Sequence, residues 1–446
     1  MGRRTARWRA AAGRGNRPPR ARGALVGALA LAVLAGLPGQ ALPAAPGAPR
    51  AYGFAPDALT VPAATNPAEA ALLVPGKTYR STLQSSGKTY FRLELGATEN
   101  SYVSATAVPR PEAVLSAVDR LKVSLQDADG GSCSLDSASF GAARSPHPIA
   151  VSGMREVSSR SSRCQGAGTY YVVVERTGTA EPAPDVWDLE LAPVTEPGLT
   201  SAEATEAPGD WDSASPAPVE GQGERRTGGE GFASAAAIGE GVWSTGIAPG
   251  QTLFYKVPVD WGQQLHATAE LGGAEAEDGS GFSVGALGLA LYNPARGPVE
   301  EKSVSYDGEQ KSAVLDPLPP VDHANRHAVA EKASGMRFAG SYYLAVHLSS
   351  RVADDFGTGP LPLTLRVRVD GDASEGPGYD GDPVPRGLFE VAAGDRASGS
   401  TSGGDEDAGN DAAMTALAVG GIGGGTVLLG GLAVWTVAAR RRGASA

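Results

Sequence analysis

Cysteines, aromatic residues and long uncharged runs are scarce in this sequence. Its 446 residues include two Cys, and only 6% of them are aromatic. The cysteines do not form a Cys-x-x-Cys pair, which argues against a redox or metal role. Only one run that is both uncharged and apolar, residues 412–439, is long enough to cross a bilayer, and the overall composition excludes a polytopic transporter. The 41% of hydrophobic residues exclude a wholly disordered chain, and the composition is not that of a collagen.

Basic residues are concentrated at the two ends of the chain. The first 41 residues contain eight Arg and no acid, and three Arg follow residue 439. The rest has 27 bases against 49 acids, a net charge of −22. Such a segment repels phosphate backbones, so nucleic acid is not expected as a partner. The 31 Arg against 7 Lys, with abundant Ala and Gly, suggest a GC-rich genome.

The N-terminus has the pattern of a secretory signal peptide. An apolar run over residues 23–37 follows the arginines and is too short to span a bilayer. Small side chains at Gly39 and Ala41 then suit a cleavage site. We therefore expect residues 1–41 to be removed on export.

The C-terminus has the pattern of a membrane anchor. Residues 412–439 carry no charge and would form about 42 Å of helix. Trp435 suits the membrane interface, and Arg440, Arg441 and Arg442 form a stop-transfer and positive-inside signal. We expect a single-pass type I protein of the cell membrane, with its bulk outside and residues 440–446 in the cytoplasm. Gly420 and Gly424 form a small-xxx-small pair through which this helix could self-associate as a homo-oligomer.

The region between these ends contains a tandem repeat. Short runs with alternating apolar residues recur after about 160 to 175 residues, separated by Gly or Pro turns. Three pairs show it: Leu121–Leu125 with Leu287–Leu291, Gly168–Val172 with Gly340–Leu344, and Trp187–Leu191 with Leu363–Val367.

Each copy predicts an antiparallel β-sandwich, so the fold class is all-β with two tandem jelly-roll-like domains. Pro-, Gly- and acid-rich composition predicts a linker between the copies and a disordered stalk after the second. The expected domains are a first sandwich at 66–196, a linker at 197–231, a second sandwich at 232–370 and a stalk at 371–411.

A Gly-x-Thr-x-Phe/Tyr strand near the start of each copy and a Gly-Thr/Ser-Tyr-Tyr strand near its end resemble bacterial pre-peptidase C-terminal domains. The second copy is similar to repeats of actinobacterial surface proteins. The resemblance covers both copies and implies a β-sandwich fold that accompanies another activity. Some relatives carry a von Willebrand A or protease domain. This chain has no Asp-x-Ser-x-Ser motif and no room for a peptidase domain.

The two cysteines predict one disulfide. Cys133 and Cys164 both lie in the exported part, where disulfides persist. Their pairing would close a loop of about 32 residues.

Three further patterns could carry chemistry. Asp127 and Asp129 offer oxygen ligands to calcium, or form a hairpin turn. His323 and His327 have the i, i+4 spacing of metal ligands, although a polar loop explains them as well. A Gly-x-Ser-x-Gly match at Ser283, followed by Asp316 and His347, has the order of a hydrolase triad. Chance predicts about 0.7 such matches here, so we expect no catalytic residue and no cofactor other than calcium.

These patterns predict a non-enzymatic cell-surface module for binding or assembly, with an envelope protein or a cell-wall polymer as partner. The alternative is an accessory subunit that docks to a separate catalytic or von Willebrand A-type envelope protein. An autonomous hydrolase is the third class.

Overall fold

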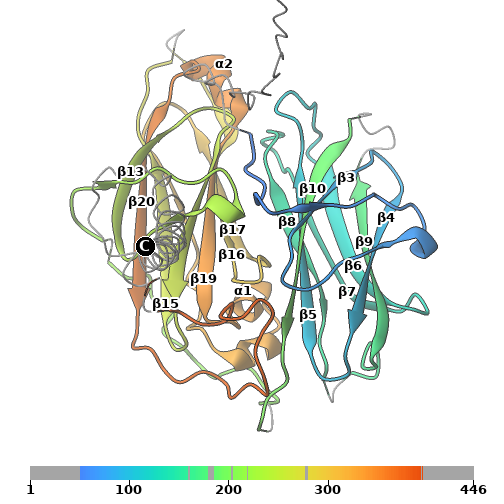
Figure 1. Ribbon diagram of the computed structural model, residues 1–446. Coiled ribbons are helices and arrows are strands. Elements are labelled where there is room, and N and C mark those ends of the chain that lie inside the picture. Colours follow the sequence, from blue (N-terminus) through green and yellow to red (C-terminus); the bar gives the residue numbers. More distant parts are fainter. Residues whose placement is uncertain are drawn as a thin grey trace, which may run out of the picture. The chain divides into compact units, whose positions relative to one another are not determined.

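The structure is a computed structural model of the chain (Figure 1). It describes residues 51–392 and 394, except 159–160, 179–184, 202–203, 218 and 277–279. The predicted signal peptide, membrane helix and tail lie outside the described residues, as do Gly420, Gly424, Trp435 and Arg440 to Arg442. In the part of the chain that the structure describes, no helix is long and apolar enough to cross a membrane.

The first half consists of β-strands whose apolar residues alternate between core and surface. Phe91, Leu93 and Leu95 of β4 are buried, because successive side chains of a strand point to opposite faces of its sheet. The elements are β1 Leu59–Thr60, the 3-10 helix η1 Pro67–Glu69, β2 Ala71–Leu72, β3 Tyr79–Leu83, β4 Lys88–Leu95, β5 Asn100–Val108, β6 Arg120–Asp127, β7 Ser132–Ser139, β8 Ile149–Arg155, β9 Gly168–Thr177 and β10 Trp187–Glu196.

The second half repeats this order of strands and adds short helices before and after β19. Its elements are β11 Glu224–Arg225, η2 Phe232–Ser234, β12 Ala236–Ala237, β13 Gly241–Ile247, β14 Thr252–Val259, β15 Gln264–Leu271, β16 Ser283–Tyr292, β17 Pro298–Tyr306, β18 Lys311–Val314, η3 His323–His327, α1 Glu331–Gly335, β19 Gly340–Leu348, η4 Ser350–Val352, α2 Ala353–Phe356 and β20 Leu361–Asp370.

The described strands form four five-stranded sheets, two in each half. The orders are β1-β3-β10-β5-β8 and β2-β4-β9-β6-β7 in the first sandwich, and β11-β13-β20-β15-β18 and β12-β14-β19-β16-β17 in the second. Each strand of the first sandwich thus has a counterpart ten numbers higher in the second. From β3 to β10, every connection except β6–β7 crosses to the other sheet, as in jelly rolls. The all-β class and the repeat that the sequence predicts are present.

Each sandwich encloses its own hydrophobic core. In the first, Trp187, Leu189 and Leu191 of β10 pack against inward-facing residues of β4, β6 and β9. In the second, Leu363 and Leu365 of β20 belong to the corresponding cluster. The strand register places Val103 opposite Pro193 and Leu265 opposite Val369, which aligns the two repeats residue by residue.

The folded region is wider than the sequence predicts. Strand β1 lies before residue 66, and β11 lies inside the predicted linker. Residues 371–392 were expected to belong to a disordered stalk, but Val384 pairs with Thr195 and Phe389 is buried against Phe338. Hydrogen bonds between peptide groups drive this pairing, and composition does not reveal them.

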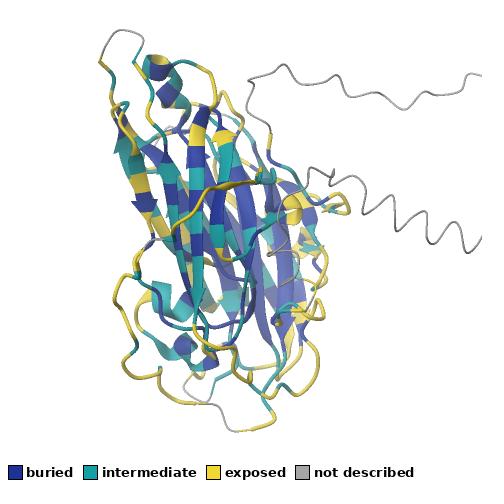
Figure 2. Ribbon diagram, turned by 90° about the vertical axis from the view of Figure 1, so that its left-hand side faces the viewer, coloured by how far each residue is buried: buried dark blue, intermediate teal, exposed yellow. Residues whose placement is uncertain are grey.

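The two sandwiches stack through the sheets that face each other in Figure 1. These are the sheet containing β5, β8 and β10 and the sheet containing β14, β16 and β19. As a result β5 is buried on both faces, with eight of its nine residues buried, whereas its counterpart β15 alternates between buried and half-buried. Figure 2 shows this concentration of buried residues in the strands.

Candidate functional site

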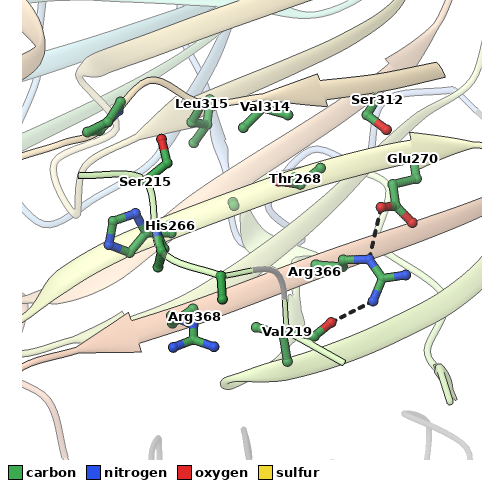
Figure 3. Close-up of a pocket in the computed structure, with 14 residues that line it drawn as sticks. Ser215, Val219, His266, Thr268, Glu270, Ser312, Val314, Leu315, Arg366 and Arg368 are labelled. Carbon is green, nitrogen blue, oxygen red and sulfur yellow. Dashed lines mark hydrogen bonds and ion pairs between the residues drawn. The ribbon is translucent and has the colours of Figure 1, made fainter. Parts of the chain in front are cut away.

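A cavity of about 300 Å³ lies on the outer face of the second sandwich, away from the first. Its floor is formed by β15, β18 and β20, and residues 215–217 and 219 cross above them (Figure 3). The lining residues are Ser215, Pro216, Ala217, Val219, His266, Ala267, Thr268, Glu270, Ser312, Val314, Leu315, Pro317, Arg366 and Arg368.

The sheet holds the crossing segment by its backbone carbonyls. Arg366 Nη1 donates to the carbonyl of Val219 at 2.6 Å, and its Nε donates to Glu270 Oε1 at 2.9 Å. Gln264 Nε2 donates to the carbonyl of Asp212 at 3.0 Å. The segment is therefore fixed near both ends, and the cavity lies beneath its middle.

The floor contains several polar groups. Arg368 Nε is buried without an acceptor among the described residues, while Arg368 Nη1 lies 3.7 Å from Asp370 Oδ1. The hydroxyls of Thr268 and Ser312 also line the cavity. His266 Nε2 lies 3.5 Å from Asp370 Oδ2, yet burial lowers the pKa of His266 more than this carboxylate raises it. The imidazole is therefore mostly neutral near pH 7, and it can both donate and accept a hydrogen bond.

The counterpart of this cavity in the first sandwich is occupied by the second sandwich. The matching strand registers of the two repeats make Ser104 the equivalent of His266 and Glu190 the equivalent of Arg366. Ser104 Oγ donates to the carbonyl of Arg296 at 3.3 Å, and Arg296 Nη1 donates to Glu190 Oε1 at 2.8 Å. The same surface of the fold therefore already serves once as a docking site.

A second buried ion pair joins the sandwiches and the C-terminal segment. Glu196 is fully buried and accepts from Asn100, from Tyr102, and from Tyr379 of the C-terminal segment. Arg326 donates to both of its oxygens, at 3.2 and 2.7 Å. Burial alone would raise the pKa of Glu196, but Arg326 and His323 outweigh it and hold that pKa far below its ordinary value.

Two stacked histidines form a third contact between the sandwiches. The rings of His147 and His347 lie 4.3 Å apart with an interplanar angle of 20°. The carbonyl of Gln251 can only accept, so His347 Nδ1 carries the hydrogen, and Nε2 accepts from the hydroxyl of Ser145 at 2.9 Å. Burial lowers the pKa of both imidazoles, and for His347 the neighbouring His147 lowers it further.

This histidine pair predicts a loss of stability in mild acid. A folded-state pKa below the unfolded value of about 6.5 means that stability is complete above that pH and is lost as pH falls through it. We expect the free energy of unfolding to fall by up to about 1.4 kcal/mol per pH unit and per histidine between pH 6.5 and 5. Urea denaturation across this range measures it. His147→Phe, which keeps a stacked ring, should reduce the slope; an unchanged slope would contradict the assignment.

The residues singled out in the sequence are only partly brought together. Cys133 and Cys164 form the predicted disulfide, with Cα atoms 5.7 Å apart. Asp127 accepts from the backbone N–H groups of Asp129 and Gly131, as in a hairpin turn. The described residues contain no group of three or more His, Cys, Asp or Glu side chains that could hold a metal. Calcium at Asp127 and Asp129 thus stays a prediction.

The residues of the triad pattern have other partners. His347 bonds Ser145, and Asp316 bonds Lys302 Nζ at 2.9 Å. Ser283 Oγ is buried, with no hydrogen bond to any described residue. His323 lies 3.4 Å from Glu196, in the ion pair described above.

The docking residues Glu190, Glu196, Arg296 and Arg326 were not found by sequence reasoning. Glu190 and Glu196 lie at outward positions of β10, where charge normally indicates solvent. One usable signal was present in β5, whose outward residues Tyr102, Ser104, Thr106 and Val108 carry no charge.

No known protein family and no curated protein matches the sequence. Solved structures share only remote similarity. Tripeptidyl peptidase 2 is 10% identical over 69% of this chain and 27% of its own, with a TM-score of 0.22. The CBM22-1-CBM22-2 tandem domain of Paenibacillus barcinonensis Xyn10C is 10% identical over 67% and 93%, with a TM-score of 0.17. The ANX2 ectodomain of Arabidopsis thaliana is 10% identical over 67% and 86%, with a TM-score of 0.18.

Proposed function

We propose that this chain is a non-enzymatic assembly module of the cell envelope, exported and anchored by its C-terminal helix. Its docking site is the cavity on the outer face of the second sandwich. One observation carries the proposal: the first sandwich uses the counterpart of this surface, with Glu190 at the position of Arg366, to hold the second. The disulfide supports an oxidising compartment, as expected for an exported protein.

The chemistry of the lining favours a protein over a wall glycan as the occupant. Aliphatic groups of Val314, Leu315 and Pro216 alternate with the guanidinium groups of Arg366 and Arg368. None of the described lining residues is Trp, Tyr or Phe, so the cavity lacks the side chains that usually stack on a sugar ring. Guanidinium groups suit carboxylates and backbone carbonyls, and Arg366 already binds one carbonyl here.

In-cell cross-linking tests this function. A photoreactive amino acid at Thr268, in the cavity floor, should capture one dominant envelope protein in intact cells of the producing bacterium. The same group at Thr364, on the outer face of the same sheet but outside the cavity, is the matched control. Thr268→Trp should fill the cavity and abolish capture from a reactive group placed at Ser215. Equal capture from positions 268 and 364, or capture of wall fragments alone, would contradict docking of a protein at this cavity.

A further inference from the structure

The stack of four sheets ends in two outer faces that the sandwiches do not use on each other. One is the outer face of β2-β4-β9-β6-β7 in the first sandwich, and the other that of β11-β13-β20-β15-β18 in the second. The outer face of the first sandwich corresponds to the β12-β14-β19-β16-β17 face, by which the second sandwich docks. The outer face of the second sandwich corresponds to the β1-β3-β10-β5-β8 face, which receives it. The contact is thus head-to-tail, and both of its halves are present once more at the ends of the molecule.

The second sandwich inserts the turn at residues 293–297 into the contact, and this inserting turn also has a counterpart on the first outer face. Asn293 and Gly297 of the inserting turn share two hydrogen bonds: Asn293 N–H to the Gly297 carbonyl at 2.9 Å, and Gly297 N–H to Asn293 Oδ1 at 3.0 Å. Asp127 and Gly131 make the same two bonds, at 2.9 and 2.7 Å. In both turns the fourth residue has positive φ: Arg296 at 58° and Gly130 at 82°.

The charges at the two ends are complementary. The counterpart of Arg296 is Gly130, and Asp129 beside it supplies the carboxylate of this turn. The counterpart of Glu190 on the receiving face is Arg366, which also bonds Glu270. The turn thus offers an acid and the receiving face a guanidinium, the reverse of the existing contact.

An apolar contact of the existing interface also has a counterpart pair on the outer faces. In the existing interface Ala150 and Phe254 belong to one buried cluster. Their counterparts are Val314 and Tyr90. Val314 is 52% exposed, and Tyr90 is half-buried on the outer face of β4. Burying these two side chains against each other would remove apolar surface from water.

The segment above the cavity does not obstruct such a contact. The chain preceding β1 crosses the receiving face of the first sandwich in the same way, where the N–H of Ala55 donates to Glu190 Oε2 at 3.0 Å. Tyr52 of that segment belongs to the buried cluster of the interface. The docked second sandwich therefore accommodates a segment at this place.

We propose that the partner at the cavity is a second copy of this chain, docked head-to-tail. The turn at residues 127–131 and Tyr90 of one copy then lie on Arg366, Arg368 and Val314 of the next. The proposal rests on the assembly function above and names its partner. Because the contact is heterologous, each docked copy presents one further free face, so more copies can add at the cell surface.

End-blocked variants of the full chain in detergent test this arrangement. Tyr90→Arg spoils the first outer face, and Val314→Arg spoils the second. The parent chain should show a mass that rises with concentration in analytical ultracentrifugation, whereas each variant alone should remain monomeric. An equimolar mixture of the two variants retains one intact pair of faces, so it should form a species of twice the monomer mass. Val329→Arg, at a fully exposed loop residue on neither face, is the control and should behave as the parent.

Three outcomes would overturn the proposal. They are a parent chain that stays monomeric at millimolar concentration, a mixture that forms no dimer, and an oligomer unaffected by both variants. The last would point to the C-terminal helix instead. If the chain does not self-associate but position 268 captures another protein in cells, the assembly function stands and only the identity of the partner is wrong.

Discussion

Replacing Glu196 with Ala is expected to destabilise the folded protein by about 3–5 kcal/mol, because it removes the buried carboxylate to which the guanidinium of Arg326 donates twice. The substitution also removes the acceptor for Asn100, Tyr102 and Tyr379. These donors come from β5 and the C-terminal segment, whereas Arg326 comes from the second sandwich. Urea denaturation at pH 7 measures the loss.

The pH dependence gives an independent check on the same residue. The pKa of Glu196 is lower in the folded state than its ordinary value of 4.5, so its contribution is present above that pH and is lost as pH falls below it. Glu196→Ala should reduce the fall in the free energy of unfolding below pH 4.5. Tyr379→Phe, which deletes one donor only, should cost about 1 kcal/mol. If Glu196→Ala costs no more than Tyr379→Phe, the ion pair does not hold the sandwiches together.

The second large effect is expected at the disulfide. Replacing Cys133 and Cys164 by Ser should lower the free energy of unfolding by about 3.7 kcal/mol, because the unfolded chain regains the entropy of a loop spanning 31 residues. The folded state should change little. Arg155 is fully buried and holds the same loop by donating to the carbonyls of Cys164, Gln165 and Gly166.

Reduction provides the matched control. The parent chain in reductant should lose the same free energy as the double variant, and the variant itself should not respond to reductant. A loss well below about 2 kcal/mol in both would mean that the loop is already ordered in the unfolded chain.

The alternation of apolar residues predicted the strands and the repeat, because burial of one face imposes a period of two. It correctly separated Phe91, Leu93 and Leu95 from their polar neighbours. It could not show that the opposite face of some strands is also buried. Glu190 in β10 lies at an outward position and reads as solvent-exposed, yet only 1% of its surface is accessible.

The candidate site was beyond reach of the sequence for a related reason. The cavity contains ordinary outward-facing residues such as His266, Glu270 and Arg366. They indicate a docking site only when the equivalent residues of the other repeat are seen to bind a partner. Ser104 and Glu190 acquire partners only when the second sandwich is in place. The segment at residues 371–392 escaped notice because backbone pairing, which composition does not encode, fixes it.

The C-terminal segment also determines how the molecule bears tension. After β20 the chain returns to the junction of the sandwiches, where Val384 pairs with Thr195 through two backbone hydrogen bonds and Tyr379 bonds Glu196. A force applied at the C-terminal end of the chain therefore reaches the last residues of β10 before it reaches β20. These contacts must break before tension from the C-terminal end pulls directly on β20.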